Sequence, residues 1–98
     1  MTNTYERQAN IRGLILRVLK DDPDQKLSDV AIAQAVSGYG YNDVSNNEIR
    51  REITFLKGRG YLSTEPKHHA LLIVKLTDKG VDFLEGRVED YAVNAPPV

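Results

Sequence analysis

Six polar side chains with the chemistry to bind nucleic acid lie within residues 45–57: Asn46, Asn47, Arg50, Arg51, Thr54 and Lys57. At about 100° per residue, Asn47, Arg51 and Thr54 share one side of a helix, with Arg50 and Lys57 on its flank. Arginine can bond guanine through two hydrogen bonds and asparagine can bond adenine likewise, each pair discriminating by about 1–3 kcal/mol. The cationic side chains can also hold phosphates. This side of the stretch is therefore a candidate surface for contact with DNA.

The same stretch carries the signals of one amphipathic helix. Ser45 and Glu48 form a capping-box pattern, in which the hydroxyl accepts from the amide three residues on and the carboxylate reaches back to the amide of Ser45. Apolar residues at helical spacing predict one buried stripe: Ile49, Ile53 and Leu56. Gly58 and Gly60 predict the end of the helix. Glu48 and Glu52 oppose contact with phosphates, unless capping occupies the first and the second lies beside the buried stripe.

The composition indicates one small domain without a global basic charge. The chain has 98 residues, of which 41% are hydrophobic, so it can bury one modest core. Thirteen Lys and Arg against fourteen Asp and Glu leave a net charge of −1, so any nucleic-acid role must come from local charge. The lack of cysteine excludes disulfides and cysteine-ligated zinc. Because the apolar runs are too short to span a bilayer and no signal-peptide pattern is present, we expect no membrane partner and a cytoplasmic location.

A first helix is expected over residues 5–20, and it has two apolar stripes. The broad stripe faces the core and consists of Ile11, Leu14, Ile15, Val18 and Leu19. The second stripe turns away from the core and consists of Tyr5, Ala9, Arg12 and Leu16. It offers a contact surface for a partner chain, including a second copy in a homodimer, or for the C-terminal segment, although scattered surface apolar residues are equally ordinary. Gly13 weakens this helix by roughly 1 kcal/mol relative to alanine.

A second helix is expected after a very short strand at Lys26 and Leu27. Ser28 has the residue type and position of its N-cap, and the helix runs to about Ser37. Residues 38–44 are rich in turn formers and connect this helix to the amphipathic one. This connection is longer than the three or four residues of a strict helix-turn-helix.

A β-hairpin is predicted after the amphipathic helix, from a strand at 61–65, a tip at 66–69 and a returning strand at 70–76. Thr77 then caps a short last helix that ends near Leu84. We expect residues 1–90 to form a single domain. The remaining residues, 91–98, contain two prolines and are expected to form a flexible tail.

This order of elements is that of a winged helix-turn-helix domain, mainly α with a β-hairpin (α+β), in the order α-(β)-α-α-β-β-α. Two segments carry the resemblance: IRREITFLKGRGYL at residues 49–62 and KLTDKG at residues 75–80. Both are similar to patterns in small bacterial PadR-, MarR- and ArsR-like regulators, in which the helix leads through a basic residue and glycine into the wing. The opening ANIRGLILRVL also resembles the small winged-helix proteins of Mu-like prophages.

The resemblance implies a partner, double-stranded DNA, and a role as a transcriptional regulator or as an accessory factor in phage DNA transactions. It implies that the amphipathic helix enters a major groove with its polar side chains. It also implies that the wing tip, Lys67, His68 and His69, meets the DNA backbone or the minor groove. The alternative is a non-enzymatic module for protein–protein interaction on the same scaffold, because fold alone does not determine function. Such a module would bind protein through the second stripe of the first helix or through the polar face of the amphipathic helix.

Catalytic and metal-dependent functions have little support in the sequence. The carboxylates of Asp21, Asp22 and Asp24 lie in a loop, and neither a nucleophile–base set nor a glycine-rich phosphate loop is present. Adjacent histidines such as His68 and His69 point in opposite directions on a strand, so they make a poor chelate. We therefore expect neither an enzyme nor a cofactor.

Overall fold

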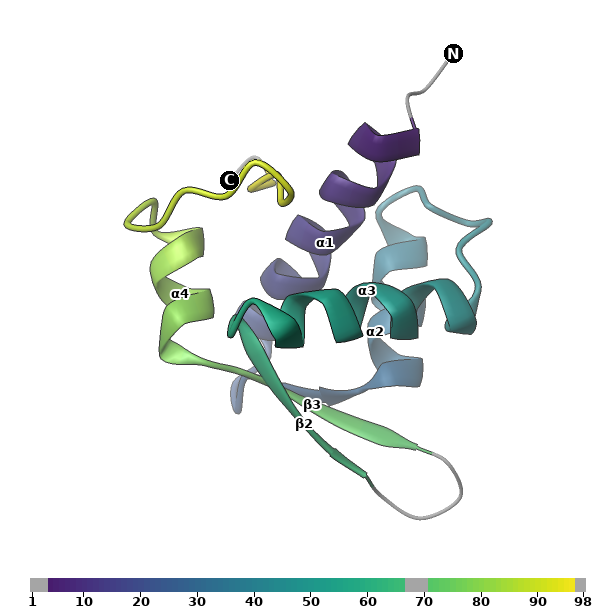
Figure 1. Ribbon diagram of the computed structural model, residues 1–98. Coiled ribbons are helices and arrows are strands. Elements are labelled where there is room, and N and C mark those ends of the chain that lie inside the picture. Colours follow the sequence, from purple (N-terminus) through teal and green to yellow (C-terminus); the bar gives the residue numbers. More distant parts are fainter. Residues whose placement is uncertain (1–3, 67–70, 97–98) are drawn as a thin grey trace.

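The computed structural model describes residues 4–66 and 71–96 (Figure 1). Within these ranges the chain forms four helices and three strands: α1 (Thr4–Asp21), β1 (Lys26–Ser28), α2 (Asp29–Gly38), α3 (Asn46–Gly58), β2 (Leu62–Pro66), β3 (Leu72–Leu76) and α4 (Asp78–Leu84). The order of elements is the one predicted from the sequence. The first three helices pack against one another, and the sheet lies beneath them with its hairpin extending below α3 (Figure 1).

Three hydroxyl side chains begin the three later helices, as the sequence predicted. Ser28, Ser45 and Thr77 each accept a hydrogen bond from the amide three residues on, at 3.1, 3.0 and 3.1 Å. Each bond satisfies one amide that the first helical turn leaves without a partner. The second half of the predicted capping box differs, because the carboxylate of Glu48 bonds to Arg7 instead of to the amide of Ser45.

The sheet is antiparallel, with the strand order β1-β3-β2. The hairpin strands pair from Leu62 opposite Leu76 to Pro66 opposite Leu72, while the short β1 pairs with the other edge of β3. Val74 and Leu76 are buried beneath the helices, and Lys75 between them is exposed. This alternation follows from the two-residue period of a strand and gives the sheet one covered and one solvent face.

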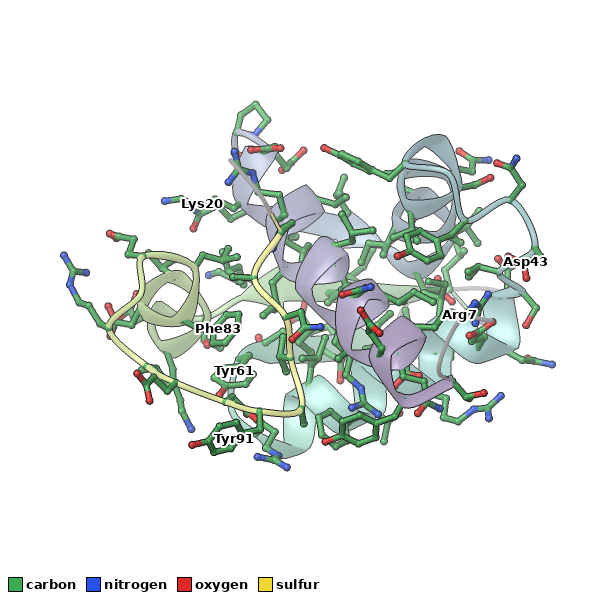
Figure 2. All side chains as sticks on the ribbon, turned by 90° about the horizontal axis from the view of Figure 1, so that it is seen from above. Arg7, Lys20, Asp43, Tyr61, Phe83 and Tyr91 are labelled. Atoms are coloured by element: carbon green, nitrogen blue, oxygen red, sulfur yellow. The ribbon has the colours of Figure 1, made fainter. Side chains whose placement is uncertain are left out.

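A single core joins the helices to the sheet. The predicted stripes of α1 and α3 are all buried, and α2, β3 and the start of β2 complete the cluster: Ile11, Leu14, Ile15, Leu19, Ile32, Val36, Ile49, Ile53, Leu56, Tyr61, Leu62, Val74 and Leu76. In α4, Val81 and Leu84 are half-buried and pack against this cluster. Phe83 is the buried residue of that helix, with its ring centroid 5.4 Å from that of Tyr61 (Figure 2).

The KLTDKG segment fastens α4 to the end of α3. The hydroxyl of Thr77 donates to the carbonyl of Gly60 at 2.6 Å, and its amide donates to the carbonyl of Tyr61 at 3.2 Å. A Cβ at Gly80 would lie 2.2 Å from the Tyr61 carbonyl oxygen, so only glycine allows this close approach. Thr77 and Gly80 of this motif therefore hold the wing and α4 against the end of α3.

The C-terminal segment, residues 88–96, runs back from α4 along α1, and we call it the C-terminal strap (Figures 1 and 2). Arg12 donates to the carbonyl of Ala92 at 3.0 Å, and the amide of Asn94 donates to the carbonyl of Ala9 at 3.0 Å. Val93 is only 3% exposed. The structure thus differs from the predicted flexible tail after residue 90, because packed chain continues as far as Pro96.

The second apolar stripe of α1 is largely covered within the protein itself. Ala9, Arg12 and Leu16 are buried, whereas Tyr5 is 56% exposed. The sequence left a partner chain and the C-terminal segment as alternatives for this stripe. The protein's own C-terminal segment contacts Ala9 and Arg12, and Leu16 is buried in the core, so these three positions are not open to a partner chain.

Candidate nucleic-acid interface

The outward face of α3 presents most of the polar residues singled out in the sequence. Five of the six are exposed: Asn46, Asn47, Arg51, Thr54 and Lys57. Within residues 4–66 and 71–96, Arg51 and Lys57 make no ion pair. The hydroxyl of Thr54 donates to the backbone carbonyl of Arg50 at 3.0 Å, one turn earlier, so its oxygen remains able to accept. The helix, which crosses the front of the molecule in Figure 1, therefore carries two amides, a hydroxyl and two cations on its exposed face.

Arg50, the sixth residue, is held by a carboxylate that the sequence did not single out. Its Nε donates to Oδ2 of Asp29 at 2.6 Å, and 43% of the Arg50 side chain remains exposed. The other oxygen, Oδ1 of Asp29, accepts from the amide of Leu72 at 3.2 Å. Burial raises the pKa of Asp29, but the hydrogen bonds from Arg50 and from the Leu72 amide lower it more, so the pKa lies below its ordinary value. One carboxylate thus joins α2, α3 and the first residue of β3.

The acids of α3 are directed away from its outward face. Glu48 bonds to Arg7, which also donates to Asp43 at 3.1 Å and lies 5.9 Å from the ring centroid of Tyr41 (Figure 2). The hydrogen bond with Glu48 raises the pKa of Arg7 above its ordinary value. The negative charge at the start of α3 is therefore matched by a cation from α1.

Glu52 lies on the inner side of α3 and is only 1% exposed. Its Oε1 accepts from Nε of Arg12 at 2.8 Å, and Oε2 has no hydrogen-bond partner within the part of the chain that the structure describes. The guanidinium of Arg12 also stacks on Phe55, 3.7 Å from its ring centroid, and that of Arg59 lies 4.9 Å from the same centroid. The conflict that the sequence suggested between Glu52 and phosphates therefore does not arise on the outward face.

Asp90 of the strap forms hydrogen bonds with residues at and just after the end of α3. It accepts from Arg59 at 3.2 Å and from the hydroxyl of Tyr61 at 2.7 Å. Burial and the bond to Asp90 raise the pKa of Tyr61 to about 12. Burial also raises the pKa of Asp90, but hydrogen bonds from Tyr61 and the Ala92 amide and the charge of Arg59 outweigh it and leave this pKa below its ordinary value.

The three-stranded sheet contributes two lysines that were not predicted as site residues. Lys26 on β1 and Lys75 on β3 lie directly opposite each other and are both exposed on the solvent face of the sheet. Neither makes an ion pair within the described ranges, and the exposed Glu65 on β2 lies along the same face. The predicted wing-tip residues Lys67, His68 and His69 lie outside the described residues. The pairing of β1 with β3 was the missing signal, since it places residues 49 positions apart side by side.

Two features are absent from the described part of the chain, a cluster of metal ligands and a helix of membrane-spanning length. No group of three His, Cys, Asp or Glu side chains there could hold a metal ion. Among the same residues, no helix is long and apolar enough to cross a membrane.

Comparison with solved structures identifies the architecture. The chain superposes on Sco3205, a MarR family transcriptional regulator from Streptomyces coelicolor crystallised in complex with DNA, with a TM-score of 0.66 and 18% identity over 82% of this chain and 50% of that one. The complex structure of hsRosR-S1 matches with a TM-score of 0.68 and 19% identity, covering 86% and 76%. BpsR of Bordetella bronchiseptica, whose DNA binding is regulated by 6-hydroxynicotinic acid, matches with a TM-score of 0.63 and 21% identity. This match covers 84% of this chain and 63% of BpsR.

These likenesses are structural and do not extend to sequence families. No family model matches the chain, and no curated protein matches its sequence. The chain spans half the length of Sco3205 and about two thirds to three quarters of the other two. The resemblance to prophage proteins finds no support among these matches. What they establish is a winged helix-turn-helix fold that matches MarR family and related winged-helix structures at low sequence identity.

Proposed function

We propose that this protein binds double-stranded DNA through the outward face of α3 and acts as a transcriptional regulator. The observation that carries the proposal is the exposure of Arg51 and Lys57, together with two asparagines, on a helix whose own acids are paired on other sides. The structural likeness to a MarR family regulator crystallised with DNA supports it. Such a protein would act in the cytoplasm, where it meets its DNA.

The charge distribution sets the expected strength of binding. Arg51 and Lys57 contribute two cations, while the charge of Arg50 is partly offset by Asp29. Each phosphate neutralised adds about 0.9 to the slope of log affinity against log salt. A homodimer with about four phosphate contacts per subunit would therefore show a slope near −7, and a monomer about half of that. Analytical ultracentrifugation with and without duplex gives the oligomeric state that accompanies the measured slope.

The decisive experiment compares two charge-matched double variants in a fluorescence-anisotropy titration of labelled duplex at low salt. Arg51→Ala with Lys57→Ala removes two cations from α3. Lys20→Ala with Arg87→Ala removes two cations from α1 and from the chain after α4, and Lys20 lies on the side of the molecule opposite α3 (Figure 2). We expect the first variant to lose most of its affinity and about two units of salt slope, and the second to retain both. Equal effects of the two variants would remove α3 as the contact surface.

The wing is proposed to add a backbone contact through Lys67, His68 and His69. Histidine charge rises as the pH falls through about 6.5, so a histidine next to phosphate would strengthen binding below that pH. We expect duplex affinity to increase between neutral pH and about pH 6. Replacement of His68 and His69 by glutamine should abolish the increase, and an affinity without pH dependence would contradict the contact.

An accessory role in phage DNA transactions rests on the resemblance of the opening ANIRGLILRVL and predicts binding to duplex without strong sequence preference. The alternative of a protein-interaction module would use the outward face of α3, or the exposed Tyr5 on α1, because Ala9 and Arg12 contact the strap and Leu16 is buried in the core. A protein that lacks duplex binding at low salt, and that recovers a protein partner from nuclease-treated lysate, would favour that alternative.

A further inference from the structure

We propose that Asp29 is a positioning residue for DNA binding, which fixes Arg50 on α3 and the start of the returning wing strand in one arrangement. The inference rests on the proposed function, since it concerns how the DNA-binding face is held. Asp29 does not itself need to touch DNA, because it is only 3% exposed and acts through the two groups that it bonds.

The geometry of this carboxylate joins three elements that must move together on a duplex. Asp29 is the first residue of α2, Arg50 lies in the middle of α3, and Leu72 is the first residue of β3. Its two oxygens are divided between them, with 2.6 Å to Nε of Arg50 and 3.2 Å to the amide of Leu72. A shift of the wing relative to α3 would therefore break at least one of the two bonds.

The bond to Arg50 is directional. A guanidinium is planar, so a carboxylate at Nε fixes the plane of the whole group and limits the rotamers of a long side chain. Because 43% of the Arg50 side chain is still exposed, this ordered group belongs to the surface that α3 presents. Asp29 thus reduces the conformational entropy that Arg50 would otherwise lose on binding.

The bond to Leu72 carries the same constraint to the wing. The pairing of β1 with β3 ends at Ser28 opposite Ile73, so no residue of β1 lies opposite Leu72, and its amide is satisfied instead by a buried side chain from α2. The start of wing strand β3 is consequently held by the same Asp29 carboxylate that orients Arg50. Binding sites are most precise where such supporting hydrogen bonds hold the contacting groups.

A purely electrostatic effect of Asp29 and a positioning role of Asp29 predict opposite changes in DNA affinity when its charge is removed. Removing a negative charge beside DNA strengthens binding if electrostatics alone matters. If Asp29 positions the face, removing it weakens binding although the protein gains positive charge. Asp29→Asn is the appropriate change, because the amide oxygen can still accept from Leu72 while the charged bond to Arg50 is lost.

We expect Asp29→Asn to lower duplex affinity by about tenfold in the anisotropy titration, a typical size for the coupling between contacting groups. The control is Asp24→Asn, an exposed loop residue with the same change in charge, which should leave affinity unchanged or slightly higher. In an Arg50→Gln background the effect of Asp29→Asn should shrink to about twofold, since Asp29 acts through Arg50. A role confined to stability would not produce this dependence on Arg50. Far-ultraviolet circular dichroism confirms that each variant is folded.

Tighter binding by Asp29→Asn, or an equal loss in both backgrounds, would overturn the inference. If Asp29→Asn does not fold, Arg50→Lys provides the same test, because it keeps the charge but lacks the planar group that the carboxylate orients. We expect Arg50→Lys to weaken binding severalfold, and an unchanged affinity would overturn the inference. If the wild-type protein binds no duplex at low salt, the proposed function fails. If it binds and these variants behave like the wild type, only the role of Asp29 fails.

Discussion

Replacing Gly13 by alanine should release residues 91–96 of the C-terminal strap from α1 without unfolding the domain. Gly13 lies in the middle of α1, and a Cβ there would lie 1.7 Å from the carbonyl oxygen of Asn94. No methyl group fits at that distance, and the contacted atom belongs to the backbone, so the strap must move away from the helix. This contact explains why a helix interior tolerates a glycine that costs about 1 kcal/mol in propensity.

The structure allows the size of the effect to be estimated. The docked strap gains about 1 kcal/mol from the bond of the Asn94 amide to Ala9, about 2 from the bond of the charged Arg12 to Ala92, and about 2 from burial of Val93. Ordering residues 91–96 costs roughly 1 kcal/mol per residue, at the lower end of the usual range. These contributions nearly cancel, and alanine returns about 1 kcal/mol to the helix. We therefore expect the free energy of unfolding to change by less than about 2 kcal/mol while the strap is lost.

Amide hydrogen exchange followed by NMR distinguishes local release of the strap from unfolding of the whole domain. The Asn94 amide, which donates to the carbonyl of Ala9 at 3.0 Å, should lose its protection in Gly13→Ala, while core amides of α1 keep theirs. Gly38→Ala is the matched control, since it lies at the end of α2 and a Cβ there meets no atom within 4 Å. Unchanged protection of the Asn94 amide in Gly13→Ala would refute the reasoning, as would the same loss in Gly38→Ala.

Three further predictions concern the attachment of α4 and the titrating groups. Gly80→Ala should lower the free energy of unfolding by about 1–3 kcal/mol, because the added Cβ would overlap the Tyr61 carbonyl; equal stability in urea would contradict this. Asp29 and Asp90 have pKa values below the ordinary one, so the stability that they contribute is present near neutral pH and is lost as the pH falls through their folded-state values. Urea unfolding in acid should show a shallower loss for Asp90→Asn than for the wild type. The pKa of Tyr61 is raised to about 12, so the stability linked to it is present below the ordinary tyrosine value and is lost as the pH rises through 12. Ultraviolet titration should therefore show one tyrosine that ionises at higher pH than an ordinary tyrosine, and this ionisation step should be absent in Tyr61→Phe.

The helices and their ends were predictable from the sequence because their signals are local. Ser28, Ser45 and Thr77 each cap a helix through a bond spanning three residues, and the periodic stripes of α1 and α3 identify their buried faces. Such patterns depend on neighbouring residues and survive in almost any tertiary context. The order of elements, and with it the winged-helix fold, followed from them.

The supporting contacts could not be predicted, because their partners are distant in sequence. Asp29 looked like an ordinary acid in a first helical turn, and its bonds to Arg50 and Leu72 span 21 and 43 residues. The strap looked like a proline-containing tail, and only the glycine in the middle of α1 signalled that a backbone passes there. Composition describes what a segment can do alone, whereas the docking of a strap depends on the surface that receives it.

The near-neutral charge of the chain is a weaker objection to DNA binding than it first appeared. A net charge counts every acid equally, but a field at one surface depends on where each acid lies. Glu48 and Glu52 are each paired with an arginine of α1, and the latter pair is buried behind α3. Arg51 and Lys57 face solvent on the other side of the same helix. Replacing Glu52 would consequently disturb the packing of α3 through Arg12 before it altered the potential at the outward face, whereas replacing Arg51 would change that potential directly.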